Sequence, residues 1–219
     1  MSTVNAEEPE KKRSVSRKPL ATAKPIGDAV YPFRSDERPF IVGIGASAGG
    51  LEALRLLLPS LPKNLGLTYV VVQHLSPTYR SMMAQLLGRE TTMLVRDIED
   101  GMLPEANTVY ITPPNRNLTL QAGHFRLVEP TKESMPKPSV NRFFASLAEE
   151  IGESTIGIIL SGTGSDGAAG IHAIKAAGGF TFSQDPETAK YSGMPQSAID
   201  TGSVDWILPP ETMVAEISL

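Results

Sequence analysis

The sequence contains no cysteine. This absence excludes a disulfide framework, a thiolate nucleophile, a zinc–thiolate site and a cysteine-ligated iron–sulfur cluster, and it suits a reducing compartment. The sequence also lacks a close cluster of histidine, aspartate and glutamate of the kind that binds metal ions. We therefore expect neither a metal nor another cofactor.

Basic residues and long apolar runs are also scarce. The 20 Lys and Arg are outnumbered by 24 Asp and Glu, which gives a net charge of −4 and no reason to expect nucleic acid as a partner. The longest apolar run, Phe40–Ala46 with glycine counted, is far shorter than the roughly 18 residues of a membrane-spanning helix. No apolar stretch of a secretory signal follows the basic start of the chain. We expect a cytoplasmic protein without direct membrane insertion.

The 219 residues are enough for one domain and an appendage. Residues 1–38 carry eight Lys or Arg, six Asp or Glu and four prolines, with no sustained apolar periodicity. This composition is typical of a disordered tail, which leaves residues 39–219 for a single folded domain.

From Phe40 onward, short apolar runs end in glycine or polar residues, and several are followed by a helical pattern. The expected strands are residues 40–44, 67–72, 109–112, 155–160, 180–183 and 204–207, and a hairpin is expected over 118–128. The expected helices are 51–58, 81–87, one that begins after an N-cap at Ser139, 168–177 and 196–200. This alternation predicts an α/β fold with a doubly wound, mostly parallel sheet in a Rossmann-like, three-layer arrangement, and an attached antiparallel hairpin.

In such sheets, sites form beyond the carboxyl ends of the strands. The first strand is followed by a glycine-rich segment that contains Ser47, the second by Gln73-His74, and the strand at 155–160 by a second glycine-rich segment that contains Asp166. Ser47 could serve as a nucleophile, His74 as its base and Asp166 as the carboxylate that orients the base. Each residue also has a structural interpretation: a helix N-cap for Ser47, an ordinary polar residue for His74 and a turn former for Asp166.

Both glycine-rich segments also match a dinucleotide-binding pattern. The first reads Gly43-x-Gly45-x-x-Ala48, but it equally fits the turn Gly45-x-Ser47-x-Gly49 that exposes a nucleophilic serine. No acidic residue ends the next strand, where a ribose would need one.

The second segment reads Gly162-x-Gly164-x-x-Gly167, with Asp185 at the end of the following strand. The negative charge of Asp166 inside this loop would oppose a pyrophosphate. Nucleotide binding here remains an alternative. His124, His172 and Trp206 are expected to have structural roles.

Five motifs in this order resemble the catalytic domain of the CheB chemoreceptor methylesterases, especially the methylesterase part of proteins in which a methyltransferase is fused to it. The resemblance covers residues 40–209, and its motifs are residues 41–50 (IVGIGASAGG), 72–74 (VQH), 110–114 (YITPP), 160–168 (LSGTGSDGA) and 193–199 (GMPQSAI).

The resemblance implies a protein-glutamate methylesterase, a serine hydrolase of chemotaxis signalling. It would release methanol from γ-glutamyl methyl esters on the cytoplasmic helices of chemoreceptors, and the same chemistry would allow deamidation of receptor glutamines. The implied triad is Ser47, His74 and Asp166, and the implied oxyanion-hole or substrate-binding residues are Ala48, Thr163 and Met194. The implied partners are a methyl-accepting chemoreceptor and a fused or separate methyltransferase.

Three departures from the family pattern support one alternative. The family often has threonine where this chain has Ala48, and methionine and asparagine where it has Thr163 and Ser165. The family's regulated members carry a receiver domain before the catalytic domain, and 38 residues are too few for one. The alternative is a non-catalytic docking module of a chemotaxis-like signalling protein.

Overall fold

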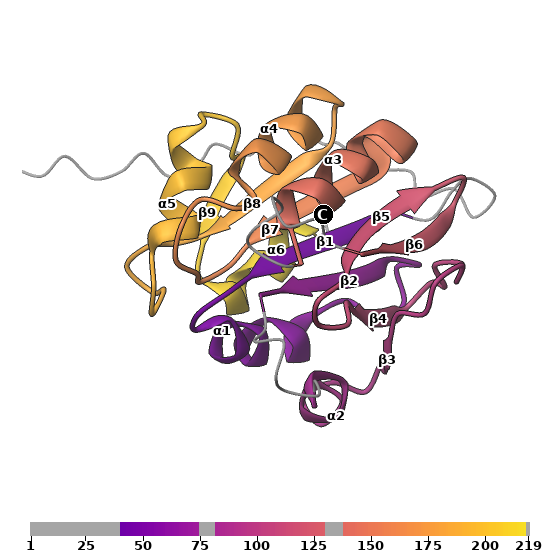
Figure 1. The fold of residues 1–219 in the computed structure, drawn as a ribbon. Coiled ribbons are helices and arrows are strands. Elements are labelled where there is room, and N and C mark those ends of the chain that lie inside the picture. The colour runs from indigo at the N-terminus through magenta and orange to yellow at the C-terminus, as the bar shows by residue number, and fades with distance from the viewer. Residues whose placement is uncertain (1–39, 75–81, 130–137, 218–219) are drawn as a thin grey trace, which may run out of the picture. The chain divides into compact units, whose positions relative to one another are not determined.

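The computed structural model describes residues 40–74, 82–129 and 138–217. The disordered tail expected over residues 1–38 lies outside these residues. The described chain forms a seven-stranded sheet in which every pair of neighbouring strands is parallel, and a separate antiparallel pair (Figure 1). The strands of the sheet are β1 (Ile41–Ala46), β2 (Thr68–Gln73), β3 (Leu94–Asp97), β4 (Thr108–Ile111), β7 (Thr155–Ile159), β8 (Phe180–Gln184) and β9 (Trp206–Leu208). The helices are α1 (Gly50–Leu57), α2 (Met83–Leu87), α3 (Val140–Ile151), α4 (Ala168–Ala176), α5 (Gly193–Asp200) and α6 (Met213–Ile217).

The strand order is β3-β4-β2-β1-β7-β8-β9. The chain first places β2, β3 and β4 on one side of β1, and later β7, β8 and β9 on the other side. This reversal makes the carboxyl ends of β1 and β7 a topological switch point, where open α/β sheets bind their ligands. The predicted doubly wound sheet is confirmed.

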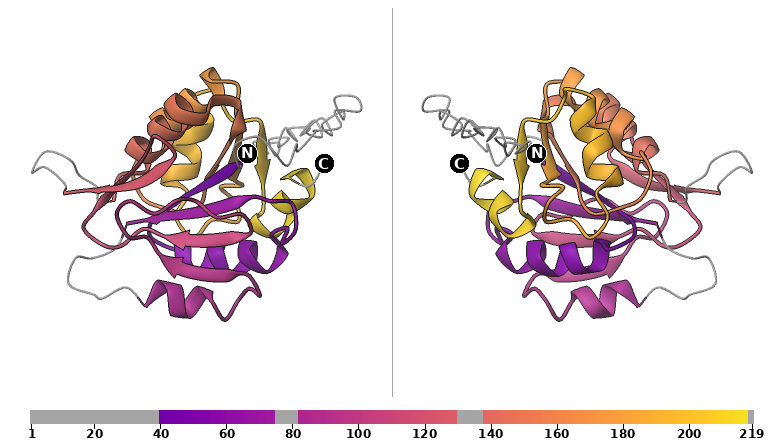
Figure 2. Two further views of the ribbon diagram at one scale, coloured as in Figure 1. Left: turned by 90° about the vertical axis from the view of Figure 1, so that its right-hand side faces the viewer. Right: turned by 90° about the vertical axis from the view of Figure 1, so that its left-hand side faces the viewer.

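The sheet is buried on both faces because its strands carry apolar side chains on both sides. In β2, Tyr69 and Val71 face one hydrophobic cluster, and Val70 and Val72 face the other. Successive side chains of a strand point to opposite faces, so one continuous apolar run supplies both cores. Helices α1, α2 and α6 contribute to the first cluster, and α3, α4 and α5 to the second. Figure 2 shows these two helical layers on either side of the strands.

The predicted hairpin is confirmed as β5 (Asn117–Gln121) and β6 (His124–Val128), which packs on α3. Two side chains of α3 fix it: Oγ of Ser146 accepts a hydrogen bond from the Leu120 N–H at 2.9 Å, and Glu150 accepts one from the Gly123 N–H at 2.9 Å. These bonds help to set the position of α3, whose N-terminus borders the site described below.

Three elements differ from the sequence expectations. Strand β3 was not predicted, because its four residues form an exposed edge strand without a clear apolar pattern. Helix α6 was not predicted either, and α5 begins at Gly193 rather than at residue 196.

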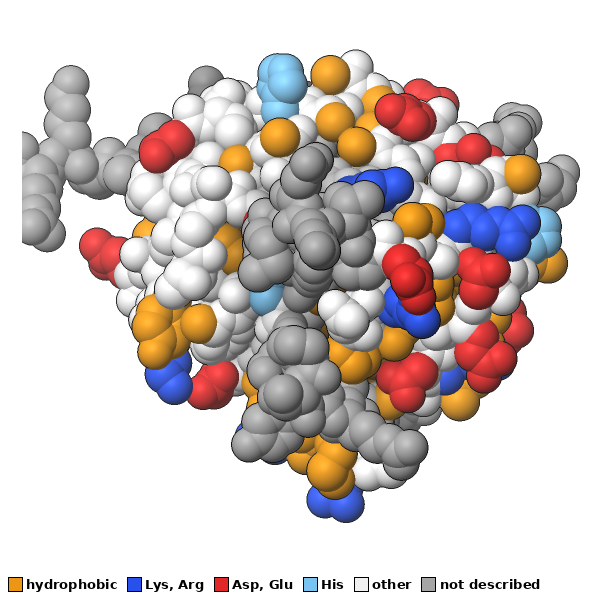
Figure 3. Space-filling model, viewed as in Figure 1, with side chains coloured by type: hydrophobic (Ala, Val, Ile, Leu, Met, Phe, Trp, Pro, Cys, Tyr) orange, Lys and Arg blue, Asp and Glu red, His pale blue; other side chains and the backbone are white. Residues whose placement is uncertain are grey.

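The charged side chains on the face shown in Figure 3 are of both signs. In the parts of the chain described, none of the helices combines the length and apolarity that a bilayer-spanning segment requires.

Candidate active site

Ser47 lies one residue beyond the carboxyl end of β1, in the turn that leads into α1. Its backbone N–H donates to Ser161 O at 3.0 Å, which ties the turn to the end of the neighbouring strand β7. Its carbonyl oxygen accepts hydrogen bonds from the Gly50 N–H at 2.9 Å and from Nε2 of Gln73 at 3.2 Å. The backbone of Ser47 is thus held on three sides, while the residue remains half-buried.

The N-cap of α1 is Gly49, with a φ of 74°, and no side chain caps this helix. The N-cap interpretation of Ser47 is therefore wrong. A positive φ is costly for residues with a side chain, which accounts for glycine at this position. The Ser47 hydroxyl therefore does not cap α1.

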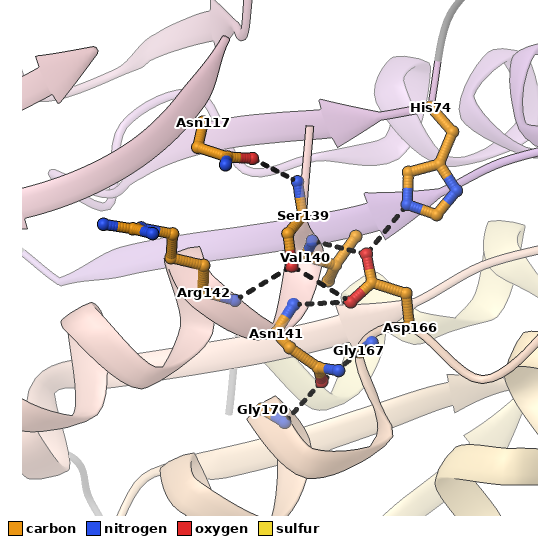
Figure 4. Close-up of polar contacts among 9 residues, drawn as sticks. All are labelled: His74, Asn117, Ser139, Val140, Asn141, Arg142, Asp166, Gly167 and Gly170. Carbon is orange, nitrogen blue, oxygen red and sulfur yellow. Dashed lines mark hydrogen bonds and ion pairs between the residues drawn. The ribbon is translucent and has the colours of Figure 1, made fainter. Parts of the chain in front are cut away.

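His74 and Asp166 are brought together from 92 positions apart in the sequence. His74 follows β2 directly, and its N–H donates to Ala46 O at 3.1 Å. Nε2 of its ring lies 2.8 Å from Oδ2 of Asp166 (Figure 4). The two side chains are 12% and 4% exposed, so water competes little for this contact.

The N-terminus of α3 holds the Asp166 carboxylate from the other side (Figure 4). The backbone N–H of Val140 donates to Oδ2 at 2.7 Å, and that of Asn141 donates to Oδ1 at 3.0 Å. The Ser139 hydroxyl donates to Oδ1 at 3.3 Å. As predicted, Ser139 is also the N-cap of α3, because its Oγ accepts from the Arg142 N–H at 3.4 Å. A helix N-terminus favours a negative charge, so this arrangement stabilises Asp166 in its ionised form.

The pKa of Asp166 reflects two opposed effects. Burial by itself raises the pKa of this carboxyl group. The hydrogen bonds from His74, Asn141 and Val140, together with the charge of His74, outweigh burial and leave the pKa of Asp166 below its usual value. Asp166 is therefore an acceptor-only carboxylate at neutral pH, and the facing Nε2 of His74 carries the proton.

Asn141 was not singled out in the sequence, yet it links α3 to the loop of Asp166. Its Oδ1 accepts the N–H of Gly167 at 2.9 Å and that of Gly170 at 2.8 Å (Figure 4). Its own N–H donates to Asp166, so one residue binds both the carboxylate and the start of α4. The only signal in the sequence is its position two residues after the predicted N-cap Ser139.

The glycines of the first segment serve helix packing. A β-carbon at Gly43 would lie 2.7 Å from the Phe144 ring, and one at Gly45 would lie 2.5 Å from the Val140 side chain. Both neighbours belong to α3, which crosses closely over β1. The dinucleotide-like spacing of Gly43 and Gly45 is thus explained by the approach of this helix.

The second segment is also occupied by contacts within the protein. Gly162 lies against the Met194 sulfur, and a β-carbon there would lie 2.9 Å from Cβ of Ser47. Asp166 faces His74 and α3, and Asp185 accepts the N–H of Glu187 at 2.9 Å, as in an ordinary turn. These contacts favour a role beside Ser47 over a phosphate cradle for this loop.

The three expected oxyanion-hole residues differ in their surroundings. Ala48 and Thr163 are exposed, and their backbone N–H groups donate to no other residue in the described ranges. Met194 is fully buried, and its N–H donates to Gly162 O at 2.9 Å. Ala48 and Thr163 therefore have free donors near Ser47, whereas Met194 packs behind Gly162.

Ser161 is a further residue that sequence reasoning missed. It is fully buried, and its hydroxyl donates to Ala48 O at 2.9 Å and accepts the Tyr191 N–H at 3.0 Å. The Ser161 N–H donates to Oε1 of Gln184 at 2.8 Å. Ser161 therefore joins the Ser47 turn to the segment before α5. A polar residue at the end of a buried strand was the available signal.

The other residues considered in the sequence lie elsewhere in contacts of their own. Nδ1 of His124 lies 2.8 Å from Ala122 O, and Nδ1 of His172 lies 3.0 Å from Oγ of Ser203. Trp206 stacks on the Phe182 ring, with 4.7 Å between the ring centroids. These contacts agree with the structural roles expected for them.

Comparison with known proteins gives a consistent result. The family model described as CheB methylesterase matches residues 42–217. A protein-glutamate methylesterase/protein-glutamine glutaminase of Carboxydothermus hydrogenoformans is 38% identical over 187 residues, which cover 81% of this chain and 54% of that protein. A second protein-glutamate methylesterase/protein-glutamine glutaminase, from Burkholderia thailandensis, is 34% identical over 222 residues, which cover 94% of this chain and 61% of that protein. The chain thus spans little more than half the length of these curated relatives.

A solved structure shows the same fold. The crystal structure of the Thermotoga maritima CheB methylesterase catalytic domain aligns with a TM-score of 0.78 and 34% sequence identity. The alignment covers 83% of this chain and 98% of that structure. On the extent of the family match and this structural similarity, the chain belongs to the CheB methylesterase family.

Proposed function

We propose that this protein is a serine esterase that hydrolyses γ-glutamyl methyl esters, with Ser47 as nucleophile, His74 as general base and Asp166 as the residue that orients the base. The carrying observation is the 2.8 Å contact between His74 and Asp166 beside the Ser47 turn. Ser47 follows β1, His74 follows β2 and Asp166 lies in the loop after β7. These three strands are neighbours in the sheet, and the residues lie beyond their carboxyl ends. Residues 39–219 would form the catalytic domain.

The geometry assigns a task to each ring nitrogen of His74. Asp166 accepts from Nε2–H, so the lone pair of the neutral ring lies on Nδ1. Nδ1 would therefore take the proton of the Ser47 hydroxyl. No hydrogen bond joins Ser47 Oγ to His74 within the described residues, and such catalytic contacts commonly tighten only when substrate binds.

The reaction would proceed through an acyl-enzyme. Ser47 Oγ attacks the ester carbonyl while Nδ1 of His74 takes its proton, and the tetrahedral intermediate expels methanol, which leaves with that proton. Water then loses a proton to His74 and attacks the acyl-enzyme, which releases glutamate and restores Ser47. With a glutamine side chain, ammonia would leave in place of methanol.

Backbone donors would stabilise the oxyanion of each tetrahedral intermediate. The free N–H groups of Ala48 and Thr163 support this assignment, and removal of one such donor costs about 10²–10³-fold in kcat in well-studied hydrolases. Met194 would act indirectly, by holding Gly162 against Ser47.

The expected substrate is a methyl-accepting chemoreceptor, in line with the names of the family and of the relatives. The esters must be made by a methyltransferase, which we propose to be a separate protein or a fused partner. Because the esters lie on the cytoplasmic helices of receptors, we propose that the protein acts in the cytoplasm.

The test is methanol release from a methylated chemoreceptor fragment. Ser47→Ala should abolish release, because no nucleophile remains. Ser60→Ala, at an exposed serine after α1, is the matched control and should retain full activity. Activity that survives in Ser47→Ala would overturn the mechanism. If wild-type protein releases no methanol and a phosphonate does not label Ser47, the protein is a docking module instead.

A further inference from the structure

Tyr191 lies beside the Ser47 turn, and its backbone is anchored by hydrogen bonds on both sides. Its N–H donates to Ser161 Oγ at 3.0 Å, and its carbonyl oxygen accepts from the Gly162 N–H at 2.9 Å. The backbone N–H and C=O of Tyr191 are thus both bound by residues just after β7. The same Ser161 hydroxyl donates to Ala48 O, so the segment of Tyr191 and the Ser47 turn share one anchor.

The Tyr191 side chain lies next to this turn and in solvent. A β-carbon at Gly49 would lie 3.3 Å from Cδ2 of Tyr191, which places the ring against the residue two positions after Ser47. The residue is nevertheless 43% exposed, one of few large hydrophobic residues with that much exposure. Tyr191 belongs to neither of the two hydrophobic core clusters.

The surroundings of the ring favour an uncharged contact surface. Ala48 and Thr163, beside Ser47, are both exposed and uncharged. The charge of the adjacent residue Lys190 is paired with Glu52 at 3.0 Å. Figure 3 shows few charged side chains over α5 and the loops next to it, in contrast to the hairpin side.

We propose that Tyr191 is a specificity-determining residue that packs against the polypeptide of the protein substrate beside the scissile ester, and not against the ester itself. This inference rests on the proposed esterase function. Tyrosine offers a large contact area and loses little conformational entropy when it is immobilised, which makes it a frequent anchor of protein interfaces. The fixed backbone of Tyr191 lowers this cost further.

The substrate side of the contact follows from helix geometry. On a helix, residues three or four positions away lie about 5–6 Å from a given side chain. When the methylated glutamate enters the site, the residues one turn away are the nearest that Tyr191 can reach. The partner is therefore an apolar or aliphatic side chain one helical turn from the methyl ester.

The test compares a large and a small substrate. Tyr191→Ala should raise KM for a methylated helical chemoreceptor fragment about tenfold, a typical loss for an interface anchor, with kcat little changed. Hydrolysis of p-nitrophenyl acetate, which has no flanking polypeptide, should remain as in wild type. Tyr191→Phe keeps the ring and should retain the wild-type KM. Ile207→Ala, at a similarly exposed side chain on β9, is the matched control and should leave KM and kcat unchanged for both substrates.

Each outcome separates this inference from the proposed function. An unchanged KM for the receptor fragment in Tyr191→Ala would overturn the inference and leave the esterase assignment intact. An equal loss on both substrates would also overturn it, because Tyr191 would then support the site rather than recognise the polypeptide. Receptor turnover that survives in Ser47→Ala would refute the proposed mechanism, whereas the KM of Tyr191→Ala would still report on recognition. An absence of receptor turnover by wild-type protein would overturn both.

Discussion

His74 faces Asp166 through Nε2, at 2.8 Å from Oδ2, and the same oxygen accepts the Val140 N–H at 2.7 Å. Oδ2 is thus shared between the ring and the N-terminus of α3. This arrangement fixes the ring of His74 and leaves Nδ1 as the atom that can act on Ser47. It also makes the position of α3 a condition for the position of the base.

Asp166→Asn should lower kcat for ester hydrolysis by about 10⁴-fold, the loss seen when an orienting aspartate is replaced in a serine hydrolase. The amide can donate to Nε2, which would put the proton on Nδ1 and remove the lone pair that Ser47 needs. Asp185→Asn, in a turn outside the site, should stay within twofold of wild type. A kcat above one-tenth of wild type in Asp166→Asn would contradict the assigned role.

The lowered pKa of Asp166 also predicts how stability depends on pH. A carboxyl group with a lowered pKa in the folded state stabilises the fold above its unfolded pKa of about 3.9, and this contribution disappears as the pH falls through the lower folded value. Urea unfolding should therefore show a gap between wild type and Asp166→Asn that is full near about pH 7 and closes towards about pH 2. A gap that widens on acidification would contradict the direction of the shift.

Asn141→Ala should destabilise the fold by about 1–3 kcal/mol, because the N–H groups of Gly167 and Gly170 lose their acceptor. Since Gly167 follows Asp166 directly, kcat should fall as well. Both are measured by urea unfolding and ester turnover. Gln196→Ala removes only an exposed side-chain hydrogen bond to Asp200 and should stay within about 0.5 kcal/mol of wild type. Equal stability of the two variants would contradict this role of Asn141.

Gly162→Ala should abolish acylation of Ser47, because the added β-carbon meets the Met194 sulfur and lies 2.9 Å from Cβ of Ser47. Phosphonate labelling of Ser47 measures this loss. Gly66→Ala is the control: Gly66 has a φ of +74° but has open space around it, so the substitution adds backbone strain of about 1–2 kcal/mol without a collision at the site. Normal labelling in Gly162→Ala would show that the loop moves freely.

Phe182→Ala should destabilise the fold by about 3–5 kcal/mol, since Phe182 is 1% exposed and stacks on Trp206. Trp206 is the only tryptophan of the chain, so its emission should shift to longer wavelength as water reaches the ring. Leu56→Ala, at a half-exposed side chain of α1, should leave both stability and emission unchanged. An unshifted emission in Phe182→Ala would contradict this prediction and would mean that neighbouring side chains fill the space left by the Phe182 ring.

Local patterns were sufficient for much of the fold. The apolar run of β2 predicted a strand buried on both faces, and Ser139 was recognised as an N-cap, because both signals depend on residues close in the sequence. Strand β3 escaped prediction because an exposed edge strand needs no apolar pattern. The order of the five motifs was sufficient to recognise the resemblance to the family. The rule that sites form beyond the carboxyl ends of parallel strands led to Ser47, His74 and Asp166.

By itself, the sequence determined most of the strands and helices, the family resemblance and the three residues on which the proposed chemistry rests, but not β3 or α6. Only the tertiary structure decided which ring nitrogen of His74 meets Asp166, that Gly43 and Gly45 serve the packing of α3, and that Asn141 and Ser161 tie the site together. The physical reason is distance along the chain. Strand and helix patterns arise from neighbours in sequence, whereas these contacts join residues 23 to 113 positions apart, and their meeting depends on how the helices pack on the sheet.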